Sequence, residues 1–167
     1  IYWLHGQQSN RFAVYLSFTT PGSLPEYNLV PGSIYHAKLC FYKGVGNLRA
    51  LFKECELSGE TYVPHFCNNL QEAASRYRET LQVNPFAENV PILIENIRLS
   101  AQGKQLYIQD VNDERMPVQI QETTKTDILA VTGGKPFAAF LLADANCWEL
   151  NTMWYQSNCY IWRDEHN

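Results

Sequence analysis

The fold is most directly indicated by the stretch Asp127-Ile-Leu-Ala-Val-Thr-Gly-Gly-Lys-Pro-Phe-Ala-Ala-Phe-Leu-Leu142. Two apolar runs flank Gly-Gly-Lys-Pro, so the chain is expected to reverse between two buried segments. The first run, 127–132, is either a short helix with Gly133 after its last residue, or a strand joined by a Gly-Gly turn to a second strand at 137–142. Pro136 just beyond the glycines is typical of a helix end, which favours the helix.

A phosphate-binding loop is the competing interpretation of Gly133-Gly134-Lys135. Such a loop needs the spacing G-x-x-x-x-G-K followed by Ser or Thr, and Pro136 stands where the hydroxyl that binds magnesium would be. Proline also lacks the backbone N–H that would donate to a phosphate. The segment is therefore predicted to be a structural turn.

The rest of the chain is mostly strand-like, with alternating or short apolar runs bounded by turn residues. Two of these strands, 34–42 and 48–55, are predicted to form an antiparallel hairpin across Gly44-Val-Gly46. The more apolar face of the first strand, with Tyr35, Ala37, Leu39 and Phe41, is expected to point inward. The predicted strands are 2–5, 11–18, 34–42, 48–55, 91–99, 105–109, 116–120, 137–142 when 127–132 is also a strand, and 150–162.

One amphipathic helix is predicted over 68–84. Asn68 or Asn69 can cap its N-terminus, Glu72 and Arg76 can pair one turn apart, and Asn84-Pro85 ends it. Its apolar stripe consists of Leu70, Ala73, Ala74, Tyr77 and Leu81.

These elements predict an α+β fold, mainly antiparallel β, built as curved sheets or a small barrel with that one helix. The 167 residues suit one domain, so a single mostly-β module over 1–167 is expected. The chain opens on Ile1 rather than Met, which indicates a fragment of a longer protein.

Composition limits the function classes. Hydrophobic residues make up 46% and charged residues 18%, which supports a real core. The net charge of −4 argues against a broad basic face for nucleic acid, although local patches stay open. Five widely spaced cysteines indicate free thiols in a reducing cytosol, so a cytoplasmic location is expected. No apolar run approaches the roughly 20 residues of a membrane helix, so no membrane partner is expected.

No catalytic, metal or cofactor site is predicted. His65 and Cys67 are two residues apart, but no signature of a thiol nucleophile surrounds them. The histidines and cysteines lack CxxC spacing, which argues against zinc. The stretch 110–114 begins like a calcium loop, but Arg115 and Gln121 occupy the positions that need Gly and Glu.

Aromatic and basic residues supply the one candidate binding surface. Exposed rings could stack on bases or sugars, and nearby cations could contact phosphates, whereas packing in the core is the competing explanation for the rings. The candidate residues are Trp3, Tyr42, Lys43, Arg49, Lys53, Trp148 and Trp154.

Several short motifs follow one another in a recognisable order: 11–18, 40–44 with 48–51, 84–86, 90–93 and 129–136. Their order resembles the C-terminal region of bacterial SWIM-type zinc-finger proteins, over roughly residues 3 to 156. Lys43 stands where that family tends to carry Pro, so the chain looks like a divergent member. The resemblance implies that the zinc finger, with ligands in the pattern C-x-C…C-x-H, lies upstream of Ile1, and it implies no activity for this region.

Three functions are compatible with these observations. The first is a non-catalytic binding or interaction module attached to a zinc-finger protein, with a protein or nucleic acid as its partner. The second is an OB-like barrel that binds single-stranded nucleic acid. The third is an enzyme of unknown class, which requires a pocket where carboxylates, or His65 and Cys67, converge.

Overall fold

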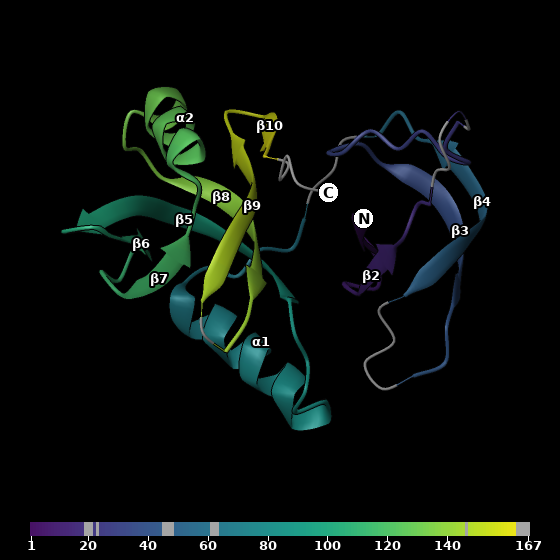
Figure 1. Cartoon of the computed structure of the whole chain (residues 1–167), viewed down its shortest axis with the longest axis horizontal. Helices are drawn as coiled ribbons and strands as arrows, with labels where there is room; N and C mark the ends of the chain where they lie inside the picture. Colours follow the sequence, from purple (N-terminus) through teal and green to yellow (C-terminus); the bar gives the residue numbers. More distant parts are fainter. Residues whose placement is uncertain (19–21, 23, 45–48, 61–63, 146, 163–167) are drawn as a thin grey trace. The chain divides into compact units, whose positions relative to one another are not determined.

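The computed structural model describes residues 1–18, 22, 24–44, 49–60, 64–145 and 147–162, and it divides into two compact units (Figure 1). Unit 1 is Ile1–His65 and unit 2 is Phe66–Asn167. A single module was the expectation from the sequence. Every strand ladder among the described residues stays within one unit. The boundary follows a short stretch that contains Ser58, Gly59 and Pro64, residue types that are equally common in ordinary loops within a domain.

Unit 1 consists of two small antiparallel sheets. One pairs β1 (Tyr2–His5) with β2 (Phe12–Tyr15), and the other pairs β3 (Tyr35–Phe41) with β4 (Ala50–Leu57). Tyr15 is buried between them, with its ring 4.8 Å from that of Phe52 and 6.2 Å from that of Tyr27. This aromatic contact joins β2 to β4 and supplies much of a small core.

The predicted hairpin of β3 and β4 is confirmed, but its inward face is only partly covered. Tyr35 and Leu39 are half-buried, whereas Ala37 and Phe41 are exposed. A bulge after Lys38 shifts the register, and the core of unit 1 is too small to cover the whole strand. Of the predicted turn Gly44-Val-Gly46, only Gly44 is among the described residues. The first residue of the predicted strand 48–55 also lies outside them.

Unit 2 contains a closed barrel of five strands. The ladders run β5–β6–β7–β9–β8 and return from β8 to β5, and all are antiparallel except β7–β9. This circuit, with a helix between its third and fourth strands, has the connectivity of an OB-fold barrel. The α+β, mainly antiparallel fold is thus confirmed. The strands are β5 (Val90–Gln102), β6 (Gln105–Gln109), β7 (Arg115–Gln119), β8 (Phe137–Ala143) and β9 (Trp148–Tyr155).

The barrel interior is filled by branched aliphatic side chains, which suit pleated strands. The fully buried residues include Ile92, Ile94 and Ile97 from β5, Ile108 from β6, Leu141 from β8 and Met153 from β9. Because side chains alternate along a strand, burying this set fixes which residues face outward.

The predicted helix is confirmed as α1 (Leu70–Val83). The Asn69 side chain accepts a hydrogen bond from the Glu72 N–H at 2.9 Å, and the Glu72 carboxylate accepts one from the Asn68 N–H at 2.9 Å. The Arg76–Glu72 ion pair also forms, at 2.9 Å. Leu70 and Ala73 bury the apolar stripe against the core.

The structure contains a second helix, α2 (Glu122–Thr132), whereas the predicted fold has one. The helical interpretation of 127–132 is right, but the helix begins five residues earlier. Its buried stripe is Thr124, Ile128 and Thr132, so two of the three residues are polar and the hydrophobic signal is weak. Figure 1 shows α1 and α2 on opposite sides of the barrel strands.

The Gly133-Gly134 turn ends α2 and has a structural role, as predicted from the sequence. Gly133 is left-handed, with φ 58°, and its N–H donates to the Leu129 carbonyl at 2.9 Å. The Gly134 N–H donates to Thr132 Oγ1 at 3.2 Å, and the Lys135 N–H donates to the Thr132 carbonyl at 3.1 Å. These amides are occupied, and they lie at the negative end of the helix dipole, so they are unsuited to phosphate.

The predicted closing strand 150–162 is wrong, because the chain forms a hairpin there. β9 ends at Tyr155 and β10 (Asn158–Ile161) pairs back onto it. The turn residues Gln156 and Ser157 have φ of 48° and 66°, so both occupy the left-handed region without the Asn or Gly that usually signals such a turn.

Replacing the turn by Gln156→Asn with Ser157→Gly is expected to raise the free energy of unfolding by about 1 kcal/mol, because it relieves backbone strain at both positions. Urea unfolding monitored by tryptophan fluorescence measures this change. A matched glycine substitution in the regular helix, Ser75→Gly, should instead destabilise by about 0.5–1 kcal/mol. An unchanged or lowered stability of the turn variant would contradict the strain argument.

No helix in the described part of the chain is long and apolar enough to cross a membrane.

Candidate functional site

The candidate site begins on the outer face of β5, β6 and β7. Cross-strand partners share a face of a sheet, and Leu99, Ile108 and Met116 pack on the core, so their neighbours along each strand point outward. The paired outward residues form rows across the three strands: Arg98, Gln109 and Arg115; then Ser100, Tyr107 and Pro117; then Gln102 and Gln105, with Gln119 following on β7.

Two guanidinium groups occupy one end of this outer face. Arg98 pairs with Gln109, and Gln109 pairs with Arg115, so the two arginines are two strands apart, about 10 Å between backbones. Both are exposed, and within the described ranges neither forms a salt bridge. The Gln109 side-chain amide, which lies between them, donates to the Asp113 carboxylate at 2.8 Å. The arginines are therefore available to an anionic ligand.

A half-buried ring lies at the middle of the outer face. Tyr107 is paired with Ser100 on one side and with Pro117 on the other. The Ser100 hydroxyl is buried and has no hydrogen-bond partner among the described residues. A ring bordered by proline and a small polar residue offers a surface on which a planar group can stack.

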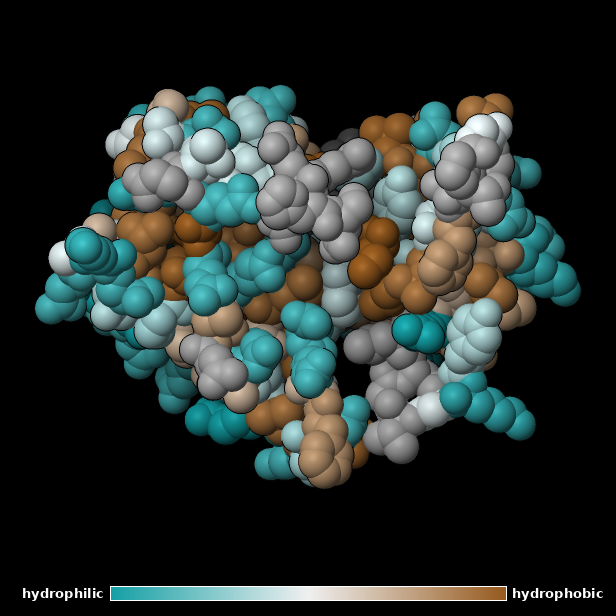
Figure 2. Space-filling model, viewed as in Figure 1, coloured by the Kyte–Doolittle hydropathy of each residue, from teal (hydrophilic) through white to brown (hydrophobic). Residues whose placement is uncertain are grey.

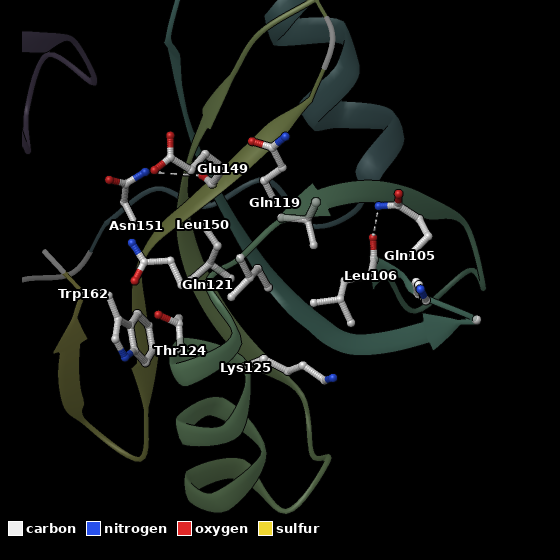
Figure 3. Close-up of a pocket in the computed structure, with 14 residues that line it drawn as sticks. Gln105, Leu106, Gln119, Gln121, Thr124, Lys125, Glu149, Leu150, Asn151 and Trp162 are labelled. Atoms are coloured by element: carbon white, nitrogen blue, oxygen red, sulfur yellow. Dashed lines mark hydrogen bonds between the residues drawn. The ribbon is translucent and has the colours of Figure 1, made fainter. Parts of the chain in front are cut away.

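At its other end the outer face opens into a groove of about 890 Å³ (Figure 3). Gln105 and Gln119 belong to both features, so the groove continues the outer face. Figure 3 shows Gln105 and Leu106 on one side of it and Asn151, Gln121 and Trp162 on the other. We call this feature the amide groove, after its lining side chains Gln105, Gln119, Gln121 and Asn151, which are joined by Lys104, Lys125, Glu149 and Trp162.

The groove exists because β7 and β9 pair over a short distance. The parallel ladder contains Val118–Trp148 and Gln119–Glu149, after which β7 leaves the barrel to enter α2. The far wall is completed by Trp162. Its backbone N–H donates to the Asn151 carbonyl at 3.3 Å, and its indole Nε1 donates to Asp127 of α2 at 3.2 Å. Trp162 is thus anchored to β9 through its backbone and to α2 through its indole.

The predicted aromatic and basic surface is divided between the two units. Trp3, Tyr42, Lys43, Arg49 and Lys53 belong to unit 1. The Tyr42 N–H donates to the Arg49 carbonyl at 3.0 Å, so these two, with the adjacent Lys43, lie at one end of the β3–β4 hairpin. Lys53 is exposed at the bulge of β4, and Trp3 is half-buried in β1. A binding role for this group stays a prediction.

The two predicted tryptophans of unit 2 pack internally. Trp148 is 4% exposed, with its ring centroid 6.2 Å from that of Tyr77 on α1, so its expected place on a surface is wrong. It points into the barrel because β9 must present alternate residues to the core. Trp154 is half-buried, and its ring lies edge-on to Phe66 at 5.7 Å.

The calcium-like stretch has a structural role. Asp110 is 6% exposed, and its carboxylate accepts backbone hydrogen bonds from Leu70 at 2.8 Å, Asn112 at 2.8 Å and Glu114 at 3.1 Å. It therefore ties the first turn of α1 to the β6–β7 turn. Within the described part of the chain no cluster of His, Cys, Asp or Glu is arranged to hold a metal ion.

Cys67 is a packed thiol. It is fully buried beside β5, where its N–H donates to the Leu93 carbonyl at 2.8 Å. Burial raises its pKa from 9.0 to about 11, so it is a poor nucleophile near neutral pH. All five cysteines are free, as the sequence predicts.

The raised pKa of Cys67 predicts a loss of stability in alkali. Since the folded pKa exceeds the unfolded one, this stabilisation is complete below pH 9.0 and is lost as the pH rises toward about 11. The free energy of unfolding should fall by up to about 1.4 kcal/mol per pH unit in this range. Urea unfolding at several pH values measures the slope, which should be shallower in Cys67→Ala. Equal slopes would contradict the assignment.

Sequence reasoning missed Arg98, Tyr107, Arg115 and the glutamines of the groove. The signal was present in Gln105-Leu-Tyr-Ile-Gln109, where Gln, Tyr and Gln alternate with two core residues. The place of Trp162 in the groove wall has no local signal, because its partners lie 35 and 11 residues away in the chain and depend on the fold.

Comparisons with protein-family models, with curated proteins and with solved structures found no match to this chain.

Proposed function

We propose that unit 2 is a non-catalytic module that binds single-stranded nucleic acid along the outer face of β5–β7 and into the amide groove. The observation that carries this proposal is the continuous order of cations, ring and amides over the strands of an OB-like barrel. In OB-folds the face of the second and third strands, here β6 and β7, is the usual surface for oligonucleotides and oligosaccharides.

Each part of the surface suits a part of such a ligand. Arg98 and Arg115 can contact phosphates, and Tyr107 can stack on a base. The carboxamides of the groove both donate and accept hydrogen bonds, as base edges require. Because the net charge of the chain is −4, attraction to phosphates has to come from local cations such as these two arginines.

The chemistry of the groove supports binding rather than catalysis. Among the described residues that line it, Glu149 is the one carboxylate, and histidine and cysteine are absent. The lining therefore offers neither a pair of carboxylates nor a Cys–His pair.

Unit 1 is proposed as a surface for a protein partner, because several large apolar side chains reach its surface. Phe41, Tyr42, Leu51 and Leu57 are between 40% and 66% exposed. Figure 2 shows apolar surface on the part of the chain that forms unit 1. The resemblance to SWIM-type proteins supports the proposal that both units serve a cytoplasmic zinc-finger protein, which a C-x-C…C-x-H pattern ahead of Ile1 would test.

The function is tested by titrating the full chain into a labelled single-stranded DNA of about 12 nucleotides at several salt concentrations. We expect the logarithm of the binding constant to fall linearly with the logarithm of the salt concentration. Unlabelled single-stranded DNA should displace the labelled strand more effectively than duplex DNA does. Competition by a neutral oligosaccharide with no salt dependence would identify a glycan site instead. No binding at about 50 mM salt would refute the proposal.

A further inference from the structure

The amide groove is bounded on the side away from the outer face. The outer face reaches it at Gln105 and Gln119, and Figure 3 shows Asn151 and Trp162 on the side opposite Gln105. Trp162 is held there by hydrogen bonds of its backbone to β9 and of its indole to α2. A strand that follows the outer face into the groove therefore meets a wall, which favours the end of a strand over its middle.

The groove is large enough for one nucleotide and has an apolar bottom. Its volume of about 890 Å³ lies within the range of about 300–1,000 Å³ that is typical of small-ligand sites. Val118 and Leu150, which are buried, and Leu106 and Ile120, which are half-buried, belong to its lining. A sugar and a base can cover this apolar surface while the carboxamides around it bind their polar edges.

Two lysines bring positive charge to the groove from separate elements. Lys104 is exposed in the β5–β6 turn, and Lys125 belongs to α2. Glu149 is the one carboxylate among the described lining residues, and Figure 3 shows the Lys125 side chain extending from α2 away from it. A phosphate on the Lys125 side of the groove therefore avoids the repulsion of the carboxylate.

The charge of two ammonium groups fits a terminal phosphate better than an internal one. A phosphate monoester carries a charge of about −1.5 to −2 at pH 7, whereas each internal phosphate of a strand carries one negative charge. An ammonium group has three N–H donors, so a lysine that already has one partner can still donate to a phosphate. Hydrogen bonds between such charged groups are among the stronger ones in proteins.

We propose that the amide groove holds the phosphorylated terminal nucleotide of a single strand, with Lys104 and Lys125 as the residues that bind its phosphate. This inference rests on the proposed function, because the rest of the strand lies on the outer face.

The test uses three unlabelled oligo-dC strands of about 12 nucleotides as competitors of a labelled strand, measured by fluorescence anisotropy. One carries a 5′-phosphate, one a 3′-phosphate, and one has hydroxyl groups at both ends. We expect one of the phosphorylated strands to compete about tenfold better than the unphosphorylated strand, and the other to compete within about twofold of it. The preferred end gives the direction of the strand.

Lys104→Gln with Lys125→Gln should reduce the tenfold advantage to less than about twofold, while the unphosphorylated strand still binds. Arg78→Gln with Lys135→Gln is the matched control, because it removes the same charge from residues that do not line the groove. This control should keep the advantage of the terminal phosphate.

Three results would overturn the inference and leave the proposed function standing. They are equal competition by all three strands, an equal gain from a phosphate at either end, and an unchanged advantage in the lysine variant. Failure of every strand to bind at about 50 mM salt would overturn both the inference and the proposed function.

Discussion

Asp110→Asn is expected to lower the free energy of unfolding of unit 2 by about 3 kcal/mol, the largest effect on stability of the substitutions considered. The carboxylate accepts hydrogen bonds from the N–H groups of Leu70, Asn112 and Glu114 in a site that is nearly closed to solvent. Asparagine retains one acceptor oxygen and turns an NH₂ group toward a backbone donor. Loss of charge-assisted bonds and an unsatisfied buried N–H each cost about 1–3 kcal/mol.

Urea unfolding followed by tryptophan fluorescence measures this loss, since three of the four tryptophans belong to unit 2. Asp113→Asn is the matched control. Asp113 is exposed and accepts a side-chain bond from Gln109, so its replacement should cost less than about 1 kcal/mol. Similar losses for the two variants would show that Asp110 does not hold α1 to the barrel.

Replacing Arg98 and Arg115 together by glutamine is expected to weaken binding to single-stranded DNA by more than about tenfold at 50 mM salt. Each arginine that contacts a phosphate contributes about 0.7 to the slope of log K against log salt, so the double variant should lose about 1.4 from that slope. The two side chains lie in one row of the outer face, which makes a joint effect expected.

The control for the arginines is Arg78→Gln with Lys135→Gln, which removes the same charge from α1 and from the turn after α2. Anisotropy titration of both double variants at several salt concentrations separates a local contact from net charge. If the control variant weakens binding and the salt slope as much as the arginine variant, the outer face is not the binding surface.

Local sequence patterns were sufficient for most elements of the fold. The capping residues and the apolar stripe located α1, and alternation located β3, β6 and β7 to within one residue. The N-terminal part of α2 was missed because its buried residue there is Thr124 rather than an apolar one. The β9–β10 turn was missed because Gln156 and Ser157 are unusual at positive φ.

The candidate site depended on information that local patterns do not contain. Arg98 and Arg115 lie 17 positions apart in the chain and share a row only through the pairing of both with Gln109. Glu149 reaches Gln119 through the parallel closure of the barrel. Trp148 was predicted to lie on the surface from its residue type alone, whereas the alternation of side chains along β9 places it in the core.

The central claim, that single-stranded nucleic acid binds the outer face of β5–β7 and the amide groove, is tested most directly by ¹⁵N-edited NMR of the full chain titrated with oligo-dC. The account predicts that the largest shifts occur at the backbone amides of β6, β7 and the Gly103–Lys104 turn and at the Trp162 indole N–H, while amides of β3 and β4 stay unchanged. Shifts confined to unit 1, or no shifts at low salt, would contradict it.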